Sequence, residues 1–270
     1  MRILLFVLAT LLISCSSKES KDLIPEKSGP STISLGYLEA PAGFEISIFA
    51  EDVTNARQMA MSDSGILYVG SRREGKVYAV VDNNNDFRAD SVYTIIEGLR
   101  LPNGVAYKDG ALFVAEVSKI WRFDNIDQNY TDSPEPVLVT DGLPTEGHHG
   151  WKYIAFGPDE KLYVPIGAPC NICNHEEDNP LFATLTRMNP DGSEHEIVAK
   201  GIRNTVGFTW HPETGNIWFT DNGRDWLGDD IPPCELNEIT GKDQHFGYPY
   251  LHGNDVWDPK FGEEGKPMAD

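Results

Sequence analysis

The stretch Gly65-Ile66-Leu67-Tyr68-Val69-Gly70 is a short apolar run that follows a turn, and similar runs occur three more times along the chain. Such runs, bounded by Gly, Asp and Asn, are typical of short β-strands. The other copies are Gly110-Ala111-Leu112-Phe113-Val114-Ala115, Glu160-Lys161-Leu162-Tyr163-Val164 and Gly215-Asn216-Ile217-Trp218-Phe219. The matched positions Leu67, Leu112, Leu162 and Ile217 lie 45, 50 and 55 residues apart. This recurrence predicts a repeat architecture.

Each repeat also holds further apolar runs before and after the matched one. Preceding runs are Gly104-Val105-Ala106-Tyr107, Tyr153-Ile154-Ala155-Phe156 and Gly207-Phe208-Thr209-Trp210; following runs are Lys76-Val77-Tyr78-Ala79-Val80 and Lys119-Ile120-Trp121-Arg122-Phe123. Repeats of about 40–50 residues with several short strands predict an all-β fold, a β-propeller. A two-sheet sandwich is the rival fold, but it leaves the recurring unit unexplained. About four blades are visible, together with a strand expected at Phe44-Glu45-Ile46-Ser47-Ile48-Phe49.

The composition sets limits on the function. Of the 270 residues 40% are hydrophobic, enough for a sizeable core. The formal net charge of −20 excludes a general nucleic-acid binder, because phosphates require a basic surface. The acidity indicates either a solvated surface or acidic clusters that hold Ca²⁺.

The first residues indicate export. Ile3 to Ile13 is nearly all apolar after a basic start, too short for a membrane span but the size of a signal-peptide core. Leu12-Ile13-Ser14-Cys15 resembles the lipobox of bacterial lipoproteins, in which Cys15 would carry the lipid. An ordinary signal peptide is the alternative. We therefore expect a lipoprotein signal peptide over residues 1–14, a flexible tether over 15–36, rich in Ser, Lys, Glu and Pro, and the propeller domain over 37–270.

Two polar loops precede first strands of neighbouring repeats. Glu146-Gly147-His148-His149-Gly150-Trp151-Lys152 holds paired histidines, one of which could take a proton from a substrate hydroxyl. Gly201-Ile202-Arg203-Asn204 occupies the matching place in the next repeat, and its donors suit an oxygen-rich anionic ligand. Surface histidines and a loop-closing arginine are the structural alternatives. Equivalent positions in the repeats place both loops toward the propeller axis.

Two acid-rich segments and the cysteines are the remaining candidates for metal-binding or structural sites. Asp221 to Asp230, followed by Glu235, and Asp82 to Asp90 hold hard oxygen ligands of the kind that Ca²⁺ prefers, although solvated loops are the alternative for both. Cys170 and Cys173 lack the adjacent His of a haem-attachment motif, and we prefer a local disulfide between them. The chain carries no P-loop, no dinucleotide fingerprint and no nucleophile elbow.

Together these motifs resemble the glucose/sorbosone dehydrogenase family, the soluble pyrroloquinoline-quinone (PQQ) sugar dehydrogenases. The similarity runs from about Ala40 to Tyr250. Its residues are His149 ahead of Gly157-Pro158-Asp159, Leu162-Tyr163, Ile166-Gly167, Gly201-Ile202-Arg203-Asn204, Asn222-Gly223, Glu235-Leu236-Asn237 and His245-Phe246-Gly247-Tyr248-Pro249. Gly167-Ala168-Pro169-Cys170-Asn171-Ile172-Cys173 is similar to the sorbosone-dehydrogenase-like branch. Each motif is weak alone; their order and spacing are specific.

The resemblance implies a site residue by residue. His149 would be the base that takes the proton from the anomeric hydroxyl before hydride passes to the quinone, and Arg203 would bond the quinone oxygens. Asn204 and Asn103 would line the cofactor. The backbone carbonyls of Gly223 and Arg224 would hold Ca²⁺, with Asp225 or Asp221 near them. His148 departs from the family, which carries an acid there that orients the base.

The family fold is a six-bladed propeller, so we expect this chain to be C-terminally truncated by about two blades, with weak or no dehydrogenase activity by itself. A ring that closes with four blades is the alternative. The implied function is PQQ- and Ca²⁺-dependent oxidation of a sugar or sugar aldehyde by an exported protein, anchored by lipid at the periplasmic face or cell surface. The electron acceptor stays open. A non-enzymatic binding module and a calcium-dependent lactonase-like hydrolase are the alternatives.

Overall fold

The computed structural model describes residues 35–175 and 177–268. The predicted signal peptide, most of the predicted tether and Cys15 lie outside these residues. Strands dominate the described part, and its two α-helices are only four residues long. No helix within it has the length and apolar character needed to cross a bilayer.

Four consecutive antiparallel sheets form propeller blades, followed by a short hairpin. The blades are β1 (Ala56–Met61), β2 (Leu67–Ser71), β3 (Val77–Val81) and β4 (Ser91–Ile96); β5 (Gly104–Lys108), β6 (Ala111–Ala115), β7 (Ile120–Phe123) and β8 (Val137–Thr140); β9 (Ala155–Phe156), β10 (Leu162–Ile166), β11 (Thr184–Met188) and β12 (Glu196–Lys200); and β13 (Thr205–Trp210), β14 (Ile217–Asp221) and β15 (Glu235–Ile239). The remaining elements are α1 (Ile126–Asn129), β16 (Leu251–His252), β17 (Val256–Trp257), α2 (Gly262–Gly265) and a 3₁₀ turn (Lys266–Met268). The predicted propeller is confirmed.

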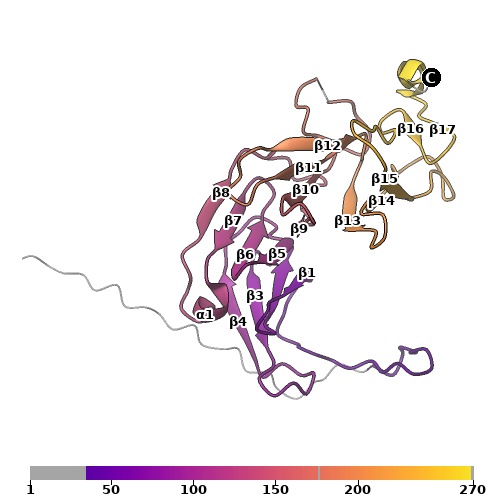
Figure 1. Ribbon diagram of the computed structural model, residues 1–270. Helices are drawn as coiled ribbons and strands as arrows, with labels where there is room; N and C mark the ends of the chain where they lie inside the picture. The colour runs from indigo at the N-terminus through magenta and orange to yellow at the C-terminus, as the bar shows by residue number, and fades with distance from the viewer. Residues whose placement is uncertain (1–34, 176, 269–270) are drawn as a thin grey trace, which may run out of the picture.

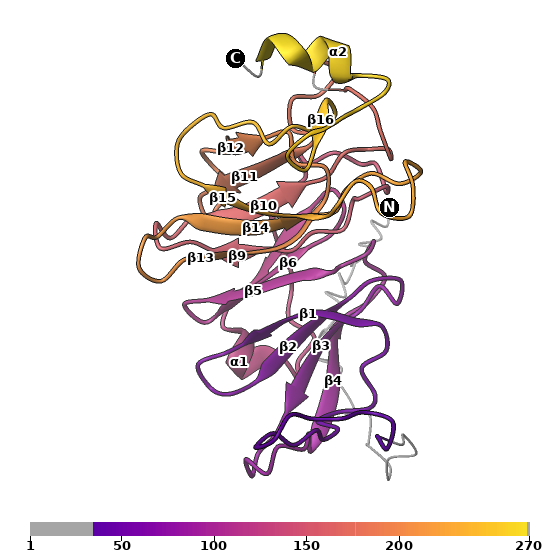
Figure 2. The same cartoon turned by 90° about the vertical axis from the view of Figure 1, so that its right-hand side faces the viewer.

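The blades follow one another around an arc, with β1, β5, β9 and β13 on its inner side (Figure 1). The view from the side shows the sheets one above another from β1–β4 upward (Figure 2). All four matched positions of the repeat, from Leu67 to Ile217, fall in the second strand of a blade. The short-range pattern therefore located the blades correctly.

The core lies between neighbouring blades. On β6, Leu112 and Val114 pack toward the first blade, whereas Phe113 and Ala115 pack toward the third. Side chains alternate between the faces of a strand, so a sheet covered on both faces needs an unbroken apolar run. This explains why all five residues of β6 are buried. A third cluster, which includes Phe208 and Phe219, joins the third and fourth blades.

The strand predicted at residues 44–49 is wrong. The segment has no strand conformation, and Phe44 is 74% exposed. Phe49, with Ala50 and Val53, instead covers the outer face of the first sheet near Val69 and Tyr78. Its apolar residues therefore cover one face of the first sheet, and the more polar β1 is the inner strand of that blade.

Candidate functional site

The predicted site loops lie at one end of the blades. Asn103 directly precedes β5, His149 lies in the loop before β9, and Arg203 and Asn204 directly precede β13. Because β5, β9 and β13 are equivalent inner strands, their preceding loops open on the same face of the propeller. The fold thus brings together loops that are 46 and 54 residues apart.

His149 is held as a neutral base. The side chain is buried, and its Nδ1 lies 2.9 Å from the carbonyl oxygen of Ala168. A carbonyl only accepts, so Nδ1 must donate its hydrogen, and the Nε2 lone pair is left free. Burial, together with the charges of Arg203 and His148, lowers the pKa of His149 to about 4. The imidazole is therefore unprotonated at neutral pH.

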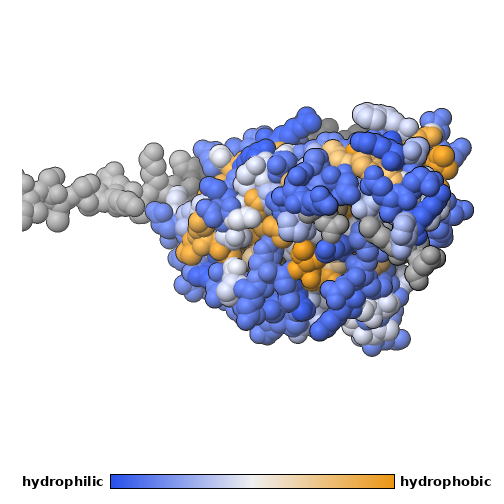
Figure 3. All heavy atoms as spheres, turned by 90° about the horizontal axis from the view of Figure 1, so that it is seen from above, coloured by the Kyte–Doolittle hydropathy of each residue, from blue (hydrophilic) through white to orange (hydrophobic). Residues whose placement is uncertain are grey.

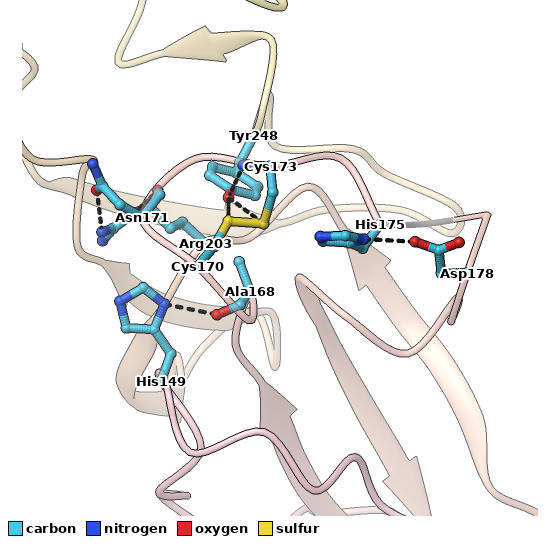
Figure 4. The surroundings of a disulfide bond; sticks show 9 residues. All are labelled: His149, Ala168, Cys170, Asn171, Cys173, His175, Asp178, Arg203 and Tyr248. Carbon is cyan, nitrogen blue, oxygen red and sulfur yellow. Dashed lines mark hydrogen bonds and ion pairs between the residues drawn. A yellow bond between two sulfur atoms is a disulfide. The ribbon is translucent and has the colours of Figure 1, made fainter.

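Backbone groups orient His149, a role that the sequence could not assign. A Cβ on Gly167 would lie 2.5 Å from the Cβ of His149, so only glycine allows the two loops to approach. Ala168 accepts from His149 and also donates its own N–H to the carbonyl of Arg203 at 2.8 Å. The backbone of Ala168 therefore fixes the base relative to the arginine (Figure 4). The ring of His148 lies beside that of His149, with centroids 4.1 Å apart.

Arg203 is buried and almost fully engaged. Its Nε donates to the carbonyl of Asn171 at 2.9 Å, and its Nη2 donates to Asn171 Oδ1 at 2.8 Å. Nη1 donates to the carbonyl of Asn222 at 3.0 Å, and Asp225 forms a longer ion pair at 3.4 Å. The second Nη1 hydrogen has no acceptor among the described residues. Burial lowers the pKa of Arg203, and the charge of Asp225 opposes this.

The loop that holds Asn171 is closed by a disulfide. Cys170 and Cys173 are bonded, as predicted, whereas Cys234 is free and exposed. The hydroxyl of Tyr248 accepts the N–H of Cys173 at 3.0 Å and lies against both sulfur atoms (Figure 4). This short ring presents two oxygens of Asn171 to Arg203.

Asp221 shapes the backbone of the Arg203–Asn204 turn. Its two carboxylate oxygens accept the N–H groups of Arg203 at 2.8 Å and Asn204 at 2.6 Å. Burial raises its pKa to about 7, although the two N–H groups favour the charged form. The hydroxyl of Thr205, the next residue, is buried without a partner among the described residues. Both carboxylate oxygens of Asp221 are therefore engaged by the turn, and its role as a support for calcium stays a prediction.

Asn103 forms hydrogen bonds with a different set of residues. Its Nδ2 donates to the carbonyl of Lys152 at 2.5 Å, and its Oδ1 accepts from Arg57 Nε at 3.1 Å. Both ends of the amide are thus committed within the protein. Sequence reasoning missed Arg57 because β1 was not recognised as a strand.

The predicted calcium turn is tied to the end of the chain. The side chain of Arg224 pairs with the buried Asp258 at 2.6 Å, and Asp258 also contacts His252 Nε2 at 3.1 Å. In the described part of the chain, no group of three or more His, Cys, Asp and Glu side chains could hold a metal. In the loop from Asp82 to Asp90, side-chain oxygens accept backbone N–H groups of the loop itself.

Comparison with known proteins shows the family to which the chain belongs. Residues 30–242 match the family described as "Domain of unknown function (DUF7133)". The chain belongs to this family. An uncharacterized protein of Borreliella burgdorferi is 33% identical over 227 residues, which cover 80% of this chain and 57% of that protein. This member of the DUF7133 family thus spans little more than half the length of that curated relative.

Solved structures show the same fold. The PQQ-bound aldose sugar dehydrogenase of Streptomyces coelicolor is 21% identical with a TM-score of 0.62, covering 79% of this chain and 69% of its own. A calcium structure of a Trichoderma reesei protein of Carbohydrate-Active Enzymes Family AA12 is 18% identical with a TM-score of 0.67, covering 83% and 64%. The PQQ domain of Coprinopsis cinerea pyranose dehydrogenase is 17% identical with a TM-score of 0.60, covering 77% and 57%. The predicted resemblance to soluble PQQ sugar dehydrogenases is confirmed for the fold.

Proposed function

We propose that this DUF7133 chain forms part of a PQQ-dependent dehydrogenase that oxidises a sugar or sugar aldehyde. The observation that carries the proposal is the fixed tautomer of His149. With Nδ1 engaged by Ala168 and a pKa of about 4, Nε2 can accept a proton from a substrate hydroxyl. Oxidation of an alcohol or hydrated aldehyde requires such a base.

The donor set beside His149 fits a quinone. Arg203 keeps one Nη1 hydrogen for a ligand, and the hydroxyl of Thr205, the residue after Asn204, is buried without a partner among the described residues. A buried hydroxyl without a partner is costly, so a polar ligand at this place would be favourable. When bound, PQQ would supply the hydride acceptor. Arg203, and Asn204 with it, would orient the ligand, and Asn103 would line the cofactor from the second blade.

Calcium would depend on backbone oxygens. The carbonyls of Gly223 and Arg224 would hold the ion, as the resemblance implies, and the exposed carboxylate of Asp225 would add charge. Carbonyl and carboxylate oxygens are the ligands that Ca²⁺ prefers. The apolar run from Ile3 to Ile13 and the motif at Cys15 support an exported, lipid-anchored protein.

A PQQ titration tests the function. We expect the full chain, supplied with PQQ and Ca²⁺, to bind the quinone, and we expect the visible absorption of the quinone to change when sugar is added. His149→Asn should lower kcat by about 10²–10⁴-fold, because it removes the base. PQQ affinity should change little. Because His149 stays neutral down to about pH 4, the acid limb of the wild-type pH profile should fall near that pH and not near 6.5.

His148→Asn is the matched control and should retain most of the activity. Near-normal turnover of His149→Asn would remove this residue from the mechanism. If the wild-type chain binds no PQQ, a binding module becomes the better interpretation. If it hydrolyses lactones without PQQ, the lactonase-like alternative holds.

A further inference from the structure

Three arginines gather beside the loop of His149. Arg57 lies on β1, and Arg72 and Arg73 directly follow β2. The three guanidinium groups interact electrostatically. Burial is the largest cause that lowers the pKa of Arg72, and the positive charges of Arg57 and Arg73 lower it further. Like charges repel, so this grouping costs free energy in the absence of a counter-charge. It is unexpected in a chain with a net charge of −20.

No carboxylate neutralises this arginine cluster. Among the described residues, none lies within ion-pair distance of Arg57, Arg72 or Arg73. Of the six other arginines in the described residues, four have acidic partners; these are Arg122, Arg187, Arg203 and Arg224. The cluster is therefore a local excess of positive charge that an external anion could balance.

Arg72 is the central member. Its Nε is buried and has no hydrogen-bond partner among the described residues, and its Cζ lies 3.6 Å above the ring of Trp151. A buried guanidinium donor without an acceptor is costly, whereas a carboxylate or phosphate would satisfy it through the planar fork. The face of Trp151 holds the fork in place by a cation–π contact.

Arg57 is also held in a defined direction. Its Nε donates to Asn103 Oδ1, and Asn103 is anchored on the carbonyl of Lys152, the residue after Trp151. The first, second and third blades thus meet at this point. Such support is what a binding subsite needs and what a freely moving surface arginine lacks.

The cluster borders the proposed base. The ring of Trp151 contacts Arg72 on one side and lies edge to face with His149, with centroids 6.4 Å apart. We propose that Arg57, Arg72 and Trp151 form a subsite for the carboxylate or phosphate of the substrate, and that the substrate is an acidic sugar. Its anomeric end would then face His149. This last step rests on the proposed function; the anion subsite does not.

Direct binding to the PQQ-free protein tests the subsite. Isothermal titration with glucose, glucuronate and glucose 6-phosphate compares one sugar ring with and without an anion. We expect both acidic sugars to bind at least about tenfold more tightly than glucose, because only they can accept a charge-assisted hydrogen bond from a guanidinium group. Arg72→Gln and Arg57→Gln should each remove most of this preference. Arg88→Gln, in the loop at the opposite end of the same blade, should retain it.

Three results would overturn the proposal. The first is equal affinity for glucose and glucuronate, and the second is a preference that survives in Arg72→Gln. The third is displacement of both acidic sugars by PQQ, which would assign the guanidinium groups to the cofactor. Thermal melts of the variants, together with the conservative change Arg72→Lys, identify a variant that has merely lost its fold. Absence of PQQ turnover would count against the proposed function alone, because this binding assay contains no PQQ.

Discussion

At the residue scale, Lys152 carries the least compensated charge of the core. Its side chain is 1% exposed, and its Nζ donates to the carbonyl of Gly150 at 2.7 Å. Burial lowers its pKa to about 7, and no carboxylate contributes to the shift. An ammonium group in such surroundings is costly, so Lys152 is a weak point of the loop that carries His149.

We expect stability to rise with pH because of Lys152. Between about pH 7 and 10.5 the unfolded chain binds a proton that the folded chain has released, so the free energy of unfolding increases through this window. The rise should be on the order of a few kcal/mol and should vanish in Lys152→Met. Urea unfolding at pH 7 and pH 10 measures it, with the exposed Lys242→Met as the control. An unchanged rise in Lys152→Met would show that another group is responsible.

At the element scale, the connection between β10 and β11 acts through its disulfide. The ring of Cys170 and Cys173 is small, so it removes little entropy from the unfolded chain and should contribute little to global stability. Its effect is local, because Asn171 within the ring contacts Arg203 through two oxygens. The connection thereby links the third blade to the loop before the fourth.

We expect the double variant Cys170→Ser/Cys173→Ser to loosen this connection without unfolding the protein. Amide hydrogen exchange over residues 168–174 should become faster by on the order of tenfold, because local opening no longer meets the crosslink. The melting temperature should change by only a few degrees. Cys234→Ser, which alters the free cysteine, should exchange as the wild type does. Unchanged exchange in the double variant would mean that Tyr248 and Arg203 hold the loop unaided.

At the scale of the whole molecule, exposed apolar side chains lie on several blades. Val137 and Leu138, on the outer strand of the second blade, are 43% and 46% exposed. Others lie on the first and last blades, at the two ends of the arc. These are Met59 and Met61 at 59% and 58%, and Val206 and Leu236 at 41% and 65%. Near Leu236 an apolar groove is lined by Phe208, Trp210 and Trp218. Separate hydrophobic areas also interrupt the hydrophilic face seen in Figure 3.

These exposed faces predict self-association. We expect the chain to form dimers or larger species at concentrations of tens of micromolar or above, because apolar patches and open sheet edges favour pairing. Leu236→Lys should shift the population toward monomer, as measured by size-exclusion chromatography with light scattering. Val137→Lys, a matched exposed change on the outer strand of a middle blade, should not. A wild-type chain that stays monomeric throughout would contradict the prediction.

The blades and part of the site could be predicted from the amino-acid sequence. Short apolar runs between turn residues specify strands through contacts between near neighbours, so positions such as Leu112 and Ile217 could be assigned without a structure. The disulfide of Cys170 followed from the same local reasoning. The positions of His149 and Arg203 before inner strands followed from the repeat.

The contacts that these residues make could be seen only in the folded molecule. Arg72 lies over Trp151, Asn171 holds Arg203, and the segment ending at Phe49 covers a sheet face where a strand was expected. Each contact joins residues from different blades or from distant turns. The local pattern of apolar residues does not specify such partners, because packing between sheets brings them together only after the strands have formed.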